Sequence, residues 1–199
     1  MRIPSTKRLL RWVLPAALAL QVITPGARAV ELDGKTWFTS PPWKVDFRNY
    51  YWYVGQTAAE YYFTITLPEQ AGAGLGGLVI QQTRGVDRTF QFSPDRTRAF
   101  VGLPRREGAA IPVQAQFDDA QRRISVQFPQ PPQPGQTITV ALKPWNNPFQ
   151  SDTYMFSVQA LPAGPNPQAA SLGFATMQIF NGIQFHAVLL KTLRLISRF

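Results

Sequence analysis

The sequence contains no cysteine and a single histidine, His186. Without cysteine there are no disulfides, and thiol catalysis, thiolate metal sites and lipid attachment to a cysteine are excluded. One histidine is too few for zinc or copper sites built from several imidazoles. General acid–base catalysis also depends most often on histidine. We therefore predict no metal, no cofactor and no catalytic residue.

Acidic residues are absent from the first 29 positions, which carry five cations. An apolar stretch from Trp12 to Ile23 follows the first four cations, and Ala27-Arg28-Ala29 has the small-x-small pattern that signal peptidase cuts after. The stretch is too short, and too interrupted by Pro15 and Gln21, to span a bilayer. We predict that residues 1–29 are a signal peptide and that cleavage after Ala29 leaves an exported protein of the periplasm, cell envelope or medium.

Loss of this segment would also lower the net charge. The whole chain carries +9, but five of its 20 cations and none of its 11 acidic residues lie in residues 1–29, so the mature chain carries +4. That charge is ordinary for a protein surface and does not indicate a nucleic-acid partner.

Short runs rich in β-branched and aromatic residues recur about every ten residues in the mature chain, separated by proline and glycine. The glycine-rich residues 71–77, the RREGA segment at 105–109 and the proline-rich residues 129–136 are predicted to be connections. About nine short strands predict one all-β domain over residues 30–181. We expect an antiparallel β-sandwich, with a partly open barrel as the alternative. The expected strands are 43–48, 61–67, 78–83, 89–93, 98–103, 111–117, 123–128, 138–144, 153–162 and 172–180.

Residues 182–199 differ from the rest of the chain because they contain no proline, no acidic residue and many apolar side chains. Their apolar residues recur at helical spacing, and their cations share another face, which predicts a short basic amphipathic helix. Two interpretations stay open. The helix covers an open face of the sandwich, or it contacts an anionic membrane or a partner. The cations that would make that contact are Lys191, Arg194 and Arg198.

Carboxylates are the remaining candidates for chemistry. Asp118 and Asp119 are adjacent, but neighbours in an extended chain point to opposite faces, and aspartates in such a segment are typical of turns. A calcium site there is an alternative. A glycosidase would need two acids facing each other across a cleft, and the sequence leaves a long-range pair open.

Aromatic residues give the clearest functional signal. Four consecutive rings, Tyr50 to Tyr53, cannot all point inward along one strand, so either Tyr51 and Tyr53 or Tyr50 and Trp52 are expected to be partly exposed. Another ring, Trp145, precedes two amides that suit hydrogen bonding to hydroxyls. The alternative is that these rings cap the ends of the core. The predicted ligand-binding residues are Tyr51, Trp52, Trp145, Asn146 and Asn147.

Short motifs run in a distinctive order through residues 31–181: Ser40-Pro41-Pro42, Ala59–Ile65, Arg98-Ala99-Phe100, Pro134–Leu142, Pro144, Asn147-Pro148, Tyr154, Phe156, Val158, Pro162-Ala163-Gly164 and Gly173. Through them the chain resembles a family of exported proteins found chiefly in cyanobacteria and described only as a domain of unknown function. The resemblance implies an exported all-β domain and implies no activity, catalytic residue or cofactor. Residues 182–199 extend beyond the usual pattern of that family.

Together these observations predict an exported, non-enzymatic protein that binds a glycan or a protein of the cell envelope through exposed aromatic rings. Two alternatives come from other classes. One is a carboxylate-dependent hydrolase of envelope polymers, and the other is a peripheral membrane protein held by its C-terminal helix.

Overall fold

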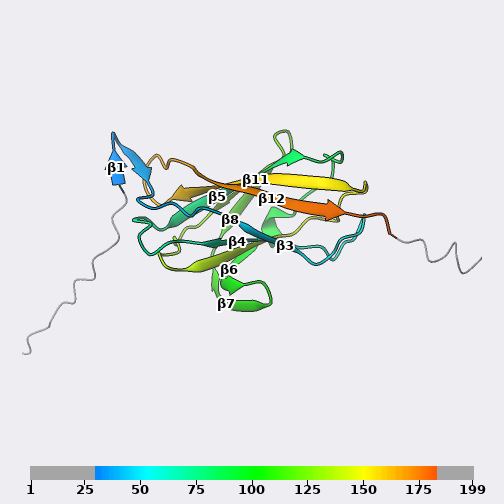
Figure 1. The fold of residues 1–199 in the computed structure, drawn as a ribbon, viewed down its shortest axis with the longest axis horizontal. Coiled ribbons are helices and arrows are strands. Elements are labelled where there is room, and N and C mark those ends of the chain that lie inside the picture. Colours follow the sequence, from blue (N-terminus) through cyan, green and yellow to red (C-terminus); the bar gives the residue numbers. More distant parts are fainter. Residues whose placement is uncertain (1–29, 183–199) are drawn as a thin grey trace, which may run out of the picture.

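The computed structural model describes residues 30–182, which form a β-sandwich of two antiparallel five-stranded sheets (Figure 1). The first sheet has the order β3-β4-β10-β6-β7, and the second has the order β12-β11-β5-β9-β8. A hairpin of β1 and β2 pairs separately from both sheets. The predicted sandwich is confirmed, and neither sheet closes into a barrel.

Twelve strands and one short 3-10 helix make up the described part of the chain, where about nine strands were predicted. Their bounds are β1 Val30–Leu32, β2 Lys35–Trp37, β3 Asp46–Asn49, β4 Tyr61–Thr66, β5 Leu75–Arg84, η1 Pro94–Arg96, β6 Arg98–Leu103, β7 Arg106–Ile111, β8 Gln114–Asp118, β9 Arg123–Gln127, β10 Thr137–Leu142, β11 Asp152–Pro162 and β12 Ala170–Ile179.

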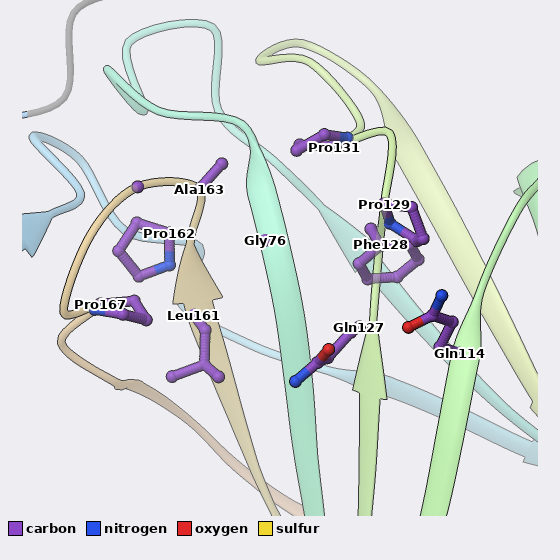
Figure 2. A pocket seen from close by; sticks show the side chains of 11 residues that line it. Gly76, Gln114, Gln127, Phe128, Pro129, Pro131, Leu161, Pro162, Ala163 and Pro167 are labelled. Carbon is purple, nitrogen blue, oxygen red and sulfur yellow. The ribbon is translucent and has the colours of Figure 1, made fainter.

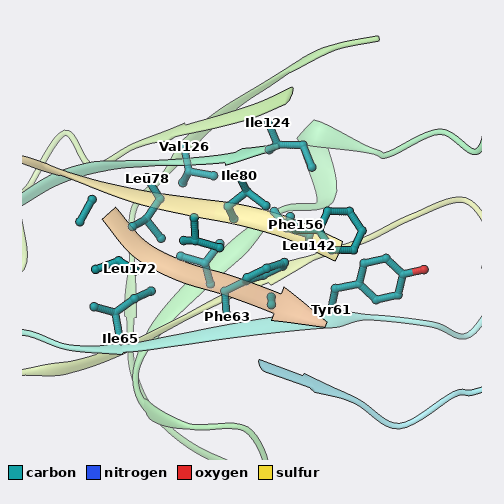
Figure 3. Close-up of a cluster of buried hydrophobic side chains, with 14 of the residues drawn as sticks. Tyr61, Phe63, Ile65, Leu78, Ile80, Ile124, Val126, Leu142, Phe156 and Leu172 are labelled. Carbon is teal, nitrogen blue, oxygen red and sulfur yellow. The ribbon is translucent and has the colours of Figure 1, made fainter. Parts of the chain in front are cut away.

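The core lies between the two sheets and is built from the inward-facing side chains of their strands (Figure 3). In β4, Tyr61, Phe63 and Ile65 point inward and are fully buried. The Phe156 ring of β11 lies 6.2 Å from the rings of both Tyr61 and Phe63, in the tilted and edge-on geometries that aromatic pairs prefer. The rings of one sheet therefore interlock with those of the other.

Several of the predicted strands and connections were wrong. The expected strand 111–117 is divided, since β7 ends at Ile111 and β8 begins at Gln114. The RREGA segment contains most of β7 rather than a turn, because the chain turns earlier, at Pro104 and Arg105, where Arg105 has φ of 63°. The glycine-rich connection ends at Leu75, because residues 75–77 already pair with β11 as part of β5. Residues 89–93 form no strand, since they carry the chain from one sheet to the other with Phe90 and Phe92 buried between them.

The predicted helix over residues 182–199 falls outside the described residues except for Gly182, and the predicted signal peptide in residues 1–29 falls outside them entirely. Between Val30 and Gly182, no helix has the length and apolar character required to cross a membrane.

One edge of the second sheet is covered by the chain around β3. Val45 N–H donates to Leu172 O at 3.2 Å near the beginning of β12. Just beyond the end of β12, Phe180 N–H donates to Trp52 O at 2.7 Å, and Val54 N–H donates to Phe180 O at 3.0 Å. This arrangement places the four-ring segment beside the end of β12.

Candidate functional site

Three loops meet at the end of the sandwich toward which β12 runs in Figure 1. They comprise residues 50–57, 144–151 and 180–182, and none of these residues is charged. Besides the bonds at Phe180, Gly55 N–H donates to Pro148 O at 3.1 Å, and Asn147 N–H donates to Gln56 O at 2.9 Å. We call this group of three loops the aromatic end.

Asn147 lies fully buried beneath the aromatic end. Its Nδ2 donates to the main-chain oxygens of Tyr51 and Tyr53, both at 2.9 Å, and its Oδ1 accepts from the Tyr61 hydroxyl at 2.8 Å. From the other side, Asn49 Nδ2 donates to Tyr51 O at 2.6 Å, and Asn49 Oδ1 accepts from Tyr51 N–H at 3.0 Å. The two asparagines hold the main chain of residues 51–53 from below.

This anchoring presents several rings to solvent. Trp52 is 48% exposed, Trp145 64% and Phe149 69%, and Tyr51, Tyr53 and Phe180 are also exposed. Tyr51, Trp52 and Tyr53 are all exposed because the segment forms only a single bridge, from Tyr53 to Phe180, and the alternation of a strand does not apply. An open pocket of about 410 Å³ lies among Trp52, Tyr53, Phe180 and Asn181.

The structure places all five predicted ligand-binding residues in the same group of loops. The aromatic end contains Tyr51, Trp52, Trp145, Asn146 and Asn147. The side-chain amide of Asn147, however, hydrogen-bonds to other groups of the protein. The Asn146 amide also bonds within the protein, since its Nδ2 donates to Asn147 O at 2.7 Å. Lys191, Arg194 and Arg198 lie outside the described residues.

Sequence reasoning missed Phe149 and Phe180 as exposed rings. Phe149 follows Asn147-Pro148 and could have been found as a second ring of the same loop, after Trp145. Phe180 ends the expected strand 172–180, and in the structure it lies just beyond β12 with its main chain bonded to Trp52 and Val54.

Replacing Asn147 with alanine is expected to lower the free energy of unfolding by about 3 kcal/mol, because two carbonyls and a buried hydroxyl lose a partner. Asn146→Ala is the matched control, since this half-buried neighbour makes one local bond and should cost less than about 1 kcal/mol. Urea unfolding followed by circular dichroism measures both. Equal losses would show that Asn147 does not anchor the loops.

Two acidic residues of the described chain share a single arginine. Glu60 and Glu107 both bind the Arg98 guanidinium, at 3.2 Å and 2.6 Å. Burial alone would raise the pKa of Glu60, but hydrogen bonds from Arg98 and Tyr62 outweigh it and lower that pKa. A general acid needs the opposite shift. Asp118 Oδ1 accepts from Gln121 N–H at 3.0 Å, as expected for a turn, and residues 30–182 contain no cluster of acidic or histidine side chains that could hold a metal.

A second pocket of about 360 Å³ lies at the opposite end of the sandwich, where β5 begins and β9 and β11 end (Figure 2). The strand at Gly76 runs between two groups of lining side chains. Gln114 and Gln127 lie on one side of that strand, and Leu161 and Pro162 lie on the other. Its lining includes no charged side chain.

Comparison with known proteins identifies a family. The model of the family described as "Protein of unknown function (DUF2808)" matches residues 35–179, most of the chain. No curated protein is significantly similar to it.

Solved structures share the fold only distantly. The collagen-binding domain of a Staphylococcus aureus adhesin is 12% identical, with a TM-score of 0.37 over 66% of this chain and 97% of that one. The collagen-binding subdomain of the Enterococcus faecalis surface protein ACE is also 12% identical, with a TM-score of 0.39 over 68% and 96%. A DUF4466 family protein from Parabacteroides merdae is 13% identical, with a TM-score of 0.40 over 70% and 46%. Likenesses this remote carry no information about a ligand.

Proposed function

The chain belongs to the DUF2808 family of proteins of unknown function, and we propose that this member is an exported, non-enzymatic binding module of the cell envelope. The observation that carries the proposal is the aromatic end, where three uncharged loops present Trp52, Trp145 and Phe149 to solvent. Contiguous exposed apolar groups are uncommon on soluble monomers and mark interaction surfaces.

The rigidity of this surface favours binding. The main chain beneath the rings is fixed by the buried side chains of Asn49 and Asn147. A ring held on a fixed main chain loses little conformational freedom when it contacts a ligand, so more of its contact energy appears as affinity. Tryptophan and tyrosine are also the residues that most often dominate binding energy.

The position of the carboxylates favours binding over hydrolysis. The three loops of the aromatic end contain no acidic residue. Glu60, just before β4, and Glu107, in β7, both form ion pairs with Arg98. The predicted signal peptide in residues 1–29 supports export, and a glycan or a protein of the envelope is the ligand predicted from the sequence. Trp52 and Trp145 would stack on such a ligand.

The test is co-sedimentation of the purified protein with isolated cell envelopes that retain both wall and membrane. We expect Trp52→Ala and Trp145→Ala each to weaken binding about tenfold, as truncation of a contact ring typically does. Trp43→Ala is the matched control, because Trp43 is 76% exposed but precedes β3, away from the aromatic end. Unchanged binding of both ring variants, or an equal loss for Trp43→Ala, would refute the proposal.

A further inference from the structure

The outward face of the second sheet carries two adjacent rows of side chains near the end where β5 begins. Cross-strand pairing fixes their members. The first row is Gln114, Gln127, Gly77 and Leu161, and the second row is Gln116, Ser125, Val79, Gln159 and Ser171. Both rows face outward, because the residues that alternate with them along the strands, such as Leu78 and Val126, are buried in the core. We call these two rows the amide face.

The amide face contains no charged side chain. The next row along the strands begins with Asp118 and Arg123, which form an ion pair at 3.6 Å, so their charges cancel. The surface of a soluble protein is commonly about 25–35% charged. A face built from amides, hydroxyls and apolar groups therefore favours a partner that is itself uncharged.

The glutamine amides of this face are available to a ligand. Gln114, Gln116, Gln127 and Gln159 are exposed, and within residues 30–182 no protein group hydrogen-bonds to their side chains. Gln81, one row further along, differs because its amide donates to a main-chain oxygen at 3.1 Å. Each unbonded amide offers two N–H donors and one carbonyl acceptor. A sugar hydroxyl, which both donates and accepts, can bond to either group of the amide.

Two hollows lie in the amide face, and Gln114 and Gln127 line both of them. One is the pocket of about 360 Å³ where β5 begins, which also reaches Leu161 (Figure 2). The other has a volume of about 20 Å³, is lined in addition by Gln116 and Ser125, and is large enough for one water molecule or one hydroxyl group. Because the two hollows share side chains, they form one uncharged recess that extends from β8 to β11.

We propose that the amide face binds a neutral polysaccharide. Sugar hydroxyls bond the glutamine amides and Ser125, and the apolar C–H groups of the sugar rings pack on Leu161 and on the prolines of the larger pocket. Neighbouring strands lie about 4.8 Å apart, so a face that crosses from β8 to β12 is about 19 Å wide and accommodates several linked sugars. The site lies toward the opposite end of the sandwich from the aromatic end, so the inference goes beyond the proposed function.

The chemistry of the face favours a neutral polysaccharide over an acidic one and over a protein. An acidic polymer is attracted by cations, and neither row contains one. A protein partner is usually held by aromatic, methionine or arginine side chains, which the two rows also lack. Amides, a hydroxyl and a few apolar groups are what a neutral sugar chain requires.

Isothermal titration calorimetry of the purified protein with dextran, mannan and galactan tests the proposal, with alginate as the acidic comparison. We expect at least one neutral polysaccharide to bind, with the same affinity at low and high salt because no charges take part. Gln114→Ala and Gln127→Ala should each weaken binding about fivefold, the effect of losing one neutral hydrogen bond. Gln121→Ala is the matched control and should leave the affinity unchanged, because Gln121 is exposed in the turn between β8 and β9, at the other end of that hairpin.

Binding to none of the three neutral polysaccharides, stronger binding to alginate, or an equal loss for Gln121→Ala would overturn the inference. So would a dimer in sedimentation equilibrium that Gln127→Ala abolishes, because a second copy of the chain would then occupy the face.

The two proposals can fail separately. Polysaccharide binding that depends on Trp52 and Trp145 instead of the glutamines would overturn the present inference and support the proposed function. Envelope binding that is insensitive to the rings would refute the proposed function alone, because the amide face is measured on purified polysaccharides.

Discussion

Replacing Gly85 with alanine is expected to lower the free energy of unfolding by about 3–5 kcal/mol. A Cβ at this position would lie only 2.1 Å from Cδ1 of Tyr154, a fully buried ring whose hydroxyl donates to Gln150 O. Overpacking of this kind costs about 1–3 kcal/mol. The φ of +123° adds about 1–3 kcal/mol for any residue other than glycine. Urea unfolding followed by circular dichroism measures the loss.

Gly173→Ala is the matched control for this prediction. Gly173 has a φ of +83°, but a Cβ there would meet no atom within 4 Å. The control therefore carries the backbone strain alone and should cost about 1–2 kcal/mol. If the two variants lose the same stability, the Tyr154 ring moves aside and the overlap argument is wrong.

Replacing Arg122 with methionine is expected to cost about 3–5 kcal/mol of unfolding free energy. The side chain is almost fully buried, and its Nη2 donates to Phe90 O at 2.6 Å while its Nε donates to Gln82 Oε1 at 3.2 Å. The guanidinium also lies about 5 Å from two ring centroids, those of Phe90 and Phe117. Its removal takes a donor away from the buried Phe90 carbonyl and from the side-chain oxygen of Gln82, each at about 1–3 kcal/mol, and removes the cation–π contacts.

The neighbour Arg123 provides the control for the Arg122 prediction. It is half exposed and pairs with Asp118 at 3.6 Å, so Arg123→Met should cost less than about 1 kcal/mol. Thermal and urea unfolding of the two variants give the comparison. A small loss for Arg122→Met would mean that methionine packs well enough to offset the lost hydrogen bonds.

Strand positions were predicted most accurately where apolar and polar side chains alternate regularly along the sequence. The strands β4, β6, β10 and β11 lie within a residue or two of their expected positions, because β-branched and aromatic side chains alternate there or run through a buried strand. In contrast, β7 has the sequence REGAAI, which has little strand character, and it forms because β6 offers it an edge to pair with. Such pairing across a turn leaves no periodic signal in the sequence.

The sequence offered candidate binding residues but not their contacts. It named Trp52 and Trp145 as candidate rings, left open which rings of residues 50–53 are exposed, and treated Asn146 and Asn147 alike. They differ in the structure because Asn147 meets Tyr61, 86 positions away, and the carbonyls of Tyr51 and Tyr53, more than 90 positions away. Contacts at such separations depend on the packing of the two sheets and cannot be derived from local sequence.

The covering of β12 has a consequence for association between copies of the protein. A ten-residue strand at the edge of a sheet would offer a row of unpaired main-chain groups to a strand from another molecule, which is a route to aggregation. Residues 45–54 occupy that edge near both ends of β12. The segment that carries Tyr51, Trp52 and Tyr53 therefore also hinders the pairing of β12 with a strand from another molecule. A ligand that contacts only the side chains of this segment leaves the edge of β12 covered. A ligand that pulled the segment away from β12 would expose that edge to strands of other molecules.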